Sequence, residues 1–221
     1  MKKILWPVAG LLFLVTTASA WADMYTFEDG IRPDAVSGGL LRSTQGYADY
    51  GFGNTLIWSG GNAITLTLSD IDPASPLNLE FDLAIIDSWD GSQGTWGTDL
   101  MNVTMNGESI FQETFSQFTT WYQSYEGDPF VSGQNLYDNT HWNDSAYHIS
   151  LFDLQPQGNT LTIEWFASGS GWQGVAHPWD ESFAIDNIQL TPSPVPEPAT
   201  LLLFGVGLTG LAGLRRKSRQ S

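Results

Sequence analysis

The sequence predicts an all-β protein, a single antiparallel β-sandwich of the jelly-roll type. We expect an N-terminal signal helix before it and a short C-terminal transmembrane helix after it. Apolar and polar residues alternate with a period of two in several central segments, and turn-forming residues separate these segments. Both chain ends carry an apolar stretch beside basic residues. The alternation gives each strand one apolar face, which a second packed sheet would bury.

The clearest strand pattern spans Leu77–Ile85, where every second residue is apolar and most of the residues between are polar. Residues 64–68 and 161–165 repeat this pattern, with Trp165 in the inward phase. Asn106-Gly107 is a dipeptide favoured in two-residue hairpin turns. No central segment has convincing helical spacing, so we expect about eight to ten short strands.

The N-terminus has the features of a secretory signal: Lys2 and Lys3, an apolar stretch, and small residues that allow cleavage after Ala20 or Ala22. We favour Ala22; the alternative is an uncleaved anchor. The expected division of the chain is a signal peptide at 1–22, the β-sandwich domain at 23–190, a proline-rich linker at 191–198, and a sorting signal at 196–219 with a transmembrane helix at 199–214.

Residues 199–214 carry no charge, and a basic cluster follows them. A helix of this length reaches roughly 24 Å, less than the roughly 30 Å of hydrocarbon in a bilayer. Four glycines weaken it further as a permanent span. The basic cluster would stay in the cytoplasm. The segment is therefore either an ordinary weak anchor or a temporary one presented to a processing enzyme.

Pro196-Glu197-Pro198, the apolar stretch, and the basic residues Arg215 and Arg216 resemble a PEP-CTERM sorting signal. The resemblance covers only about the last 25 residues, in which all three parts stand in the right order. It implies export across the inner membrane of a Gram-negative bacterium, transient anchoring, and processing by exosortase, an integral-membrane cysteine peptidase. It also implies a place on the cell surface or in an exopolysaccharide or biofilm matrix.

The central region carries 23 acidic residues against only Arg32 and Arg42, and the chain has no cysteine. This charge disfavours nucleic-acid binding, because phosphate would be repelled. It is compatible with divalent cations and with neutral ligands such as sugars. The alternative is that the acidic residues only keep the protein soluble.

Two acidic segments are candidates for a calcium site, because hard cations take six to eight oxygen ligands. They contribute Asp87, Asp90, Asp99, Asp180, Glu181 and Asp186. Their spacing does not match an EF-hand. The alternatives are that Asp90-Gly91 is only a turn and that Asp186-Asn187 marks a β-bulge, where the apolar phase changes.

The central region also resembles a recurrent domain of PEP-CTERM proteins, in segments such as "FDLAIIDSWDG" and "WDESFAIDNIQL". Its opening "YTFEDG" and closing "IDNIQL" are similar to the first and last strands of jelly-roll carbohydrate-binding modules. Such modules often hold a structural calcium ion between these strands, which implies Glu28 and Asp186 as ligands. At "SFAIDN" the sequence departs from the usual pattern, where a tryptophan-glycine pair is more typical.

Tryptophans supply the candidate sugar-binding residues, because an indole face stacks on the apolar face of a pyranose. Five of the ten lie in glycine-rich or polar contexts: Trp89, Trp96, Trp142, Trp172 and Trp179. The alternative is that these rings pack over the ends of the sandwich.

The sequence favours a binding protein over an enzyme, because it has no nucleophile elbow and no zinc-protease motif, and its three histidines are scattered. Paired carboxylates that hydrolyse glycosides remain a minor alternative. We expect a surface or matrix protein that binds extracellular polysaccharide, with calcium as a structural cofactor. The main alternative is a structural or adhesive protein with no glycan ligand.

Overall fold

The computed structural model describes residues 22–92, 95–117, 122–138, 141–194 and 207. The predicted signal helix and transmembrane helix lie outside these residues, except for Ala22 and Gly207. Within the described ranges, no helix combines the length and the apolar character needed to cross a membrane.

The described residues form twelve strands, rather than the eight to ten expected, and two short 3₁₀ helices. The helices are η1 (Gln45–Tyr50) and η3 (Gly174–Ala176). The strands are β1 (Asp23–Tyr25), β2 (Val36–Gly38), β3 (Leu40–Ser43), β4 (Thr55–Trp58), β5 (Ile64–Leu68), β6 (Leu77–Asp87), β7 (Leu100–Met105), β8 (Glu108–Thr114), β9 (Val131–Gln134), β10 (Asp144–Leu154), β11 (Leu161–Ser168) and β12 (Glu181–Pro192).

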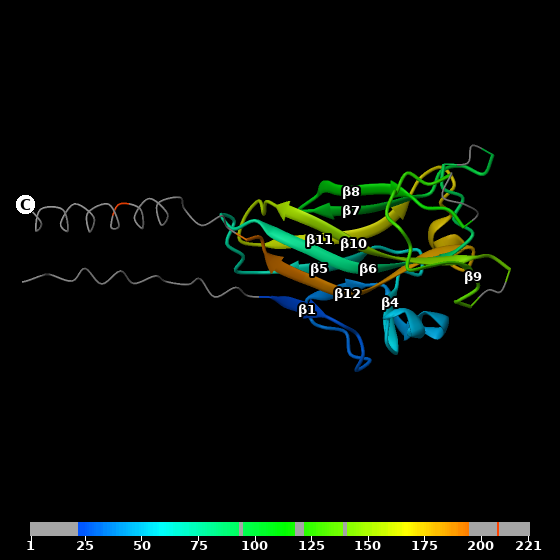
Figure 1. Cartoon of the computed structure of the whole chain (residues 1–221), viewed down its shortest axis with the longest axis horizontal. Coiled ribbons are helices and arrows are strands. Elements are labelled where there is room, and N and C mark those ends of the chain that lie inside the picture. Colours follow the sequence, from blue (N-terminus) through cyan, green and yellow to red (C-terminus); the bar gives the residue numbers. More distant parts are fainter. Residues whose placement is uncertain (1–21, 93–94, 118–121, 139–140, 195–206, 208–221) are drawn as a thin grey trace, which may run out of the picture.

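The strands form two antiparallel sheets, which confirms the prediction of an all-β sandwich (Figure 1). The larger sheet has the order β3-β4-β12-β6-β10-β9, and β1 pairs with the end of β12. The smaller sheet has the order β2-β5-β11-β7-β8. The more specific jelly-roll assignment stays a prediction.

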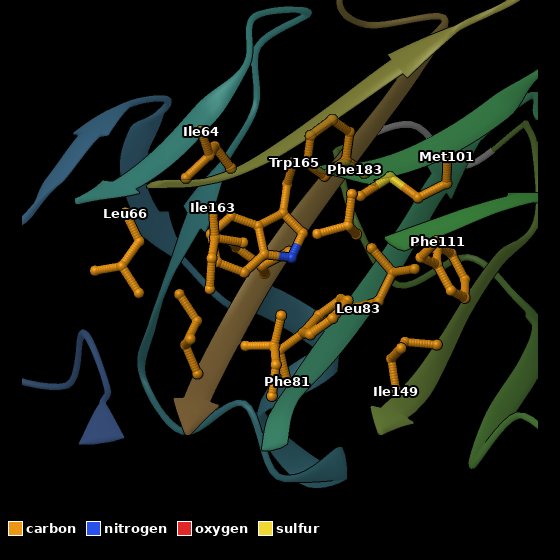
Figure 2. Packing of buried hydrophobic residues seen from close by; sticks show 14 of the residues in the cluster. Ile64, Leu66, Phe81, Leu83, Met101, Phe111, Ile149, Ile163, Trp165 and Phe183 are labelled. Carbon is orange, nitrogen blue, oxygen red and sulfur yellow. The ribbon is translucent and has the colours of Figure 1, made fainter. Parts of the chain in front are cut away.

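The predicted alternation places the core between the two sheets. In β6 the inward residues from Leu77 to Ile85 are at most 1% exposed. Figure 2 shows Phe81 and Leu83 of β6 packed near Ile163 and Trp165 of β11. The Trp165 ring meets Phe81 edge-on, with the ring centroids 5.6 Å apart, a favoured aromatic geometry. The inward phase predicted for Trp165 is therefore confirmed.

Two local predictions from turn chemistry are also confirmed. Asn106 and Gly107 both have positive φ and join β7 to β8 as a hairpin. In β12 the pairing register with β6 shifts between Asp186 and Gln189, and Asn187 has a φ of +49°. The bulge shifts the alternation of inward and outward side chains by one residue. The apolar residues before and after it are therefore all fully buried.

The outer face of the larger sheet carries a second apolar cluster, which includes Tyr47, Phe52, Trp58 and Ile86. Helix η1 contributes Tyr47, whose hydroxyl donates a hydrogen bond to the Ile85 carbonyl at 3.0 Å. Segments around η1 therefore cover part of the face that a simple two-layer sandwich would leave in water.

The two ends of the sandwich differ. At one end β1 lies against the end of β12, where Asp23 pairs with Leu190 (Figure 1). Strand β12 remains paired with β6 as far as Pro192. At the opposite end β6 stops, β12 begins, and long loops gather. The acidic segments singled out from the sequence lie mainly at this loop end.

Candidate functional site

Three acidic side chains meet at the loop end. Asp90, Asp99 and Glu181 each offer one carboxylate oxygen, and these oxygens all lie within 4.8 Å of one another. We call this set the triad. The loop after β6 supplies Asp90, which forms an isolated bridge with Ser116. The Asp90 N–H donates to Asp99 Oδ2 at 2.7 Å, which joins the start and the end of the loop between β6 and β7.

Burial dominates the electrostatics of the triad. It raises the pKa of Glu181 to about 8, and the charge of Asp99 adds to the rise. Burial raises the pKa of Asp99 to about 6, although the N–H of Asp90 opposes it. The pKa of Asp90 is also raised, by burial and then by the charge of Asp180. Without a counter-charge, the ionised triad is therefore unfavourable in the folded protein.

The triad adjoins a pocket of about 410 Å³, within the range of small-ligand sites. Its lining combines aromatic, amide, hydroxyl and carboxylate side chains: Ser88, Asp90, Trp96, Gln117, Trp142, Gly171, Gln173, Asp180 and Glu181. We call it the loop-end pocket. Among the described residues, two buried polar atoms here have no hydrogen-bond partner, Asp99 Oδ1 and Gln117 Nε2. Asp99 Oδ1 lies against Gly171, where an added Cβ would come within 2.5 Å of it.

Asp180 is held at the wall of the pocket by neighbouring donors. Ser88 Oγ donates to Asp180 Oδ1 at 3.0 Å, and Gln173 Nε2 donates to Asp180 Oδ2 at 2.5 Å. The Gln173 N–H also reaches Glu181 Oε2 at 3.4 Å. The two neighbouring acids at the start of β12 are thus positioned by the same loop residue.

The five candidate tryptophans divide into three groups. Trp96, which is 67% exposed, and Trp142 line the loop-end pocket. Trp179, which is 69% exposed, lines a separate pocket of about 70 Å³. Trp89 is fully buried and donates from Nε1 to the Ser182 carbonyl, and Trp172 packs against it with ring centroids 5.6 Å apart. Trp89 therefore has no exposed face for a sugar. Its ring packs inside the end of the sandwich, as the alternative to sugar binding expected.

Asp87 belongs to a different acidic pair. Its φ of +67° interrupts the strand alternation at the end of β6, and its N–H donates to Asp144 Oδ1 at 2.8 Å. Asp144 Oδ2 also accepts from the N–H groups of Leu136 and Tyr137. Burial and the charge of Asp144 raise the pKa of Asp87 to about 8. The sequence analysis missed Asp144, although it opens a strand whose neighbour β6 ends in Asp87.

Asp186 and Glu28 lie together, apart from the triad. Asp186 is fully buried at the bulge of β12, and its Oδ1 accepts from the Asn187 N–H at 2.7 Å. Among the described residues, Asp186 Oδ2 has no hydrogen-bond partner. Burial raises the pKa of Asp186 to about 8, and the charges of Glu28 and Asp82 add to the rise. We call this set the Asp186 site.

Solved structures with a similar arrangement include two carbohydrate-binding domains. The CBM22-1 xylan-binding domain of Paenibacillus barcinonensis Xyn10C has a TM-score of 0.42 and 13% identity; the match covers 81% of this chain and 100% of that domain. The mannan-recognising module TmCBM27 has a TM-score of 0.39 and 12% identity; the match covers 80% of this chain and 100% of that module. A GH87 α-1,3-glucanase catalytic domain has a TM-score of 0.36 and 13% identity, with 79% and 28% covered. No curated protein sequence matches the chain.

The C-terminus matches a family model described as the PEP-CTERM protein-sorting motif, over residues 194–217. This range contains all five residues that the sequence analysis assigned to sorting: Pro196, Glu197, Pro198, Arg215 and Arg216. They lie outside the described residues. The resemblance noted in the sequence is therefore confirmed, and the chain carries a PEP-CTERM protein-sorting motif at its C-terminus.

Proposed function

We propose that this chain is an exported surface or matrix protein whose sandwich binds extracellular polysaccharide in the loop-end pocket. The sorting motif supports export, transient anchoring in the inner membrane by residues 199–214, processing by exosortase, and release to the surface or matrix of a Gram-negative bacterium. No catalytic residues are assigned.

The observation that carries the proposal is the chemistry of the pocket. The indole rings of Trp96 and Trp142 provide apolar faces that can stack on a sugar ring. Amide and carboxylate groups around them can bond hydroxyls, and Gln117 Nε2 is a buried donor with no acceptor among the described residues. Buried polar groups of this kind are costly unless a ligand or water satisfies them.

Calcium is the cofactor we propose for the triad. Carboxylate oxygens are the ligands that hard cations prefer, and three of them converge here. A divalent cation would offset the cost of burying these charges and the repulsion between them, both of which otherwise favour protonation of the carboxylates. The ion would also tie the loop after β6 to the start of β12.

A glycan array probed with the full-length protein tests the proposal. Trp96→Ala removes an exposed ring that lines the pocket, and Trp179→Ala is the matched control because that ring is equally exposed but lines another pocket. We expect Trp96→Ala to weaken glycan binding by about tenfold or more, because a central aromatic contact is commonly worth more than 1 kcal/mol. Trp179→Ala should bind like the unmodified protein.

Two results would contradict the proposal. Equal losses in both variants would place the site elsewhere. Absence of binding to every glycan, together with a folded state that is insensitive to chelator, would favour the structural or adhesive alternative.

A further inference from the structure

The triad and the loop-end pocket share residues. Asp90 and Glu181 belong to both, whereas Asp99 is fully buried and contacts the pocket region through Gly171. A cation held by the triad would therefore border the pocket itself, where it could contact whatever fills the pocket.

The triad does not complete the coordination of such a cation. Each of its residues offers one ligand oxygen, which makes three, and Asp99 Oδ2 already accepts the Asp90 N–H. Calcium takes six to eight oxygens at 2.3–2.6 Å. Because Asp99 and Glu181 are buried, the remaining positions open toward the pocket. Water, further protein oxygens or the hydroxyls of a ligand can fill them.

Gln117 is a second and independent indication of a ligand. Its side chain is 7% exposed and lines the pocket, and its Oε1 accepts from the Asn143 N–H at 3.4 Å. Its Nε2 has no acceptor among the described residues. A donor held in this position calls for an acceptor oxygen inside the pocket.

The charge of the site limits the class of ligand. The triad and Asp180 place four carboxylates together, and no Lys or Arg is among the described residues that line the pocket. When all four are ionised, one divalent cation leaves the site with two net negative charges. A uronate, sulfate or phosphate would be repelled. A neutral sugar would not.

We propose that the loop-end pocket binds a neutral saccharide through a bound divalent cation, with a pair of adjacent ring hydroxyls completing the coordination begun by Asp90, Asp99 and Glu181. This inference rests on the proposed function and specifies its ligand. Trp96 and Trp142 stack on the sugar ring, and Gln117 Nε2 donates to another of its oxygens. Binding of the saccharide therefore requires the cation.

Titration calorimetry on the full-length protein tests this proposal in two steps. Calcium is titrated first, into protein stripped with chelator. Xylan, mannan and glucan oligosaccharides follow, with and without calcium, and the mannan and glucan oligosaccharides are each compared with a counterpart oxidised at C6 to uronate. Asp90→Asn removes the charge of a ligand, so it should weaken calcium binding by at least the roughly 10- to 100-fold that loss of an outer-shell partner costs, and weaken saccharide binding with it. Glu164→Gln, which removes a partly exposed carboxylate from β11 outside the pocket, should change neither.

The outcomes separate this inference from the proposed function. Calcium-dependent binding of a neutral oligosaccharide, stronger than that of its oxidised counterpart, supports both. Binding that is equal in chelator, or equal for the oxidised oligosaccharide, overturns the inference and leaves the proposed function standing. No binding of any oligosaccharide in either condition overturns both.

Discussion

The triad and the Asp186 site look alike in the sequence and differ in the structure. Each contains a fully buried aspartate with one carboxylate oxygen that lacks a partner among the described residues. At the Asp186 site, the neighbouring acids are occupied by protein groups: Glu28 accepts from the backbone and side chain of Asn54, and Asp82 accepts from Asn187. At the triad, three carboxylates converge beside an open pocket.

The difference shows how a fold treats buried negative charge. Amide donors and protonation can make a buried carboxylate tolerable where the chain supplies the donors. Where several carboxylates converge with few donors, the remaining compensation must come from outside the chain. The triad is accordingly the better candidate for a bound ion, and we expect the Asp186 site to be a structural element of the larger sheet.

The largest expected effect is on the pH dependence of stability in chelator. The pKa of Asp186 is raised to about 8 by burial and by neighbouring charges. Its contribution to stability is therefore full below about pH 4 and is lost as the pH rises through about 8. Asp186→Asn should reduce this decline by on the order of 1.4 kcal/mol per pH unit. Urea unfolding across a pH series measures it; an unchanged decline would show that Asp186 ionises without this penalty.

The next effect is calcium-dependent stabilisation. Calcium at about 100 times its dissociation constant should add about 2.7 kcal/mol to the free energy of unfolding and raise the Tm by about 5–10 °C. Asp99→Asn should abolish the shift, because it removes a triad ligand. Asp186→Asn should retain it. Thermal unfolding followed by circular dichroism decides between the two sites, since loss of the shift in Asp186→Asn alone would place the ion there.

The smallest effect concerns the bulge beside Asp186. Asn187 has a φ of +49°, and its side chain donates to the Gly51 carbonyl at 3.0 Å and to Asp82 at 2.7 Å. Asn187→Ala should lower the free energy of unfolding by about 1–2 kcal/mol, from backbone strain and lost hydrogen bonds. The calcium-induced shift should remain. A variant that unfolds normally but no longer responds to calcium would show that the bulge and the triad are coupled.

Strand patterns predicted much of this fold because alternation and turn chemistry are local. The inward residues of β6, the Asn106-Gly107 hairpin and the bulge at Asn187 follow from neighbouring residues alone. The approach of Asp90 and Asp99 to Glu181 was also expected, as the meeting of two acidic segments. The covering of the outer sheet face by η1 was not, because it depends on a long-range contact between Tyr47 and β6.

The sequence analysis drew six candidate calcium ligands from two acidic segments, and the structure places Asp87 and Asp186 apart from the triad. Glu181 and Asp186 are five residues apart in β12. In a strand, this separation is about 17 Å and places the two side chains on opposite faces of the sheet. Strand parity alone could have separated them. The position of the Asp87 side chain was harder to predict. Its left-handed backbone conformation redirects a side chain that simple alternation would point inward. No sequence pattern singled out Gln117 as a binding residue. Only the structure identifies it, as a buried donor without an acceptor among the described residues.

Strand β12 has a mechanical consequence. It begins with Glu181 of the triad and ends at Pro192, two residues before the sorting motif. A chain fastened beyond the C-terminal end of β12 would hold the pocket outward, at the far end of a strand about 40 Å long. Tension between a captured polymer and that attachment would run lengthwise along β12. The backbone hydrogen bonds that pair β12 with β6, β4 and β1 would then bear the load together, and they would not break one after another.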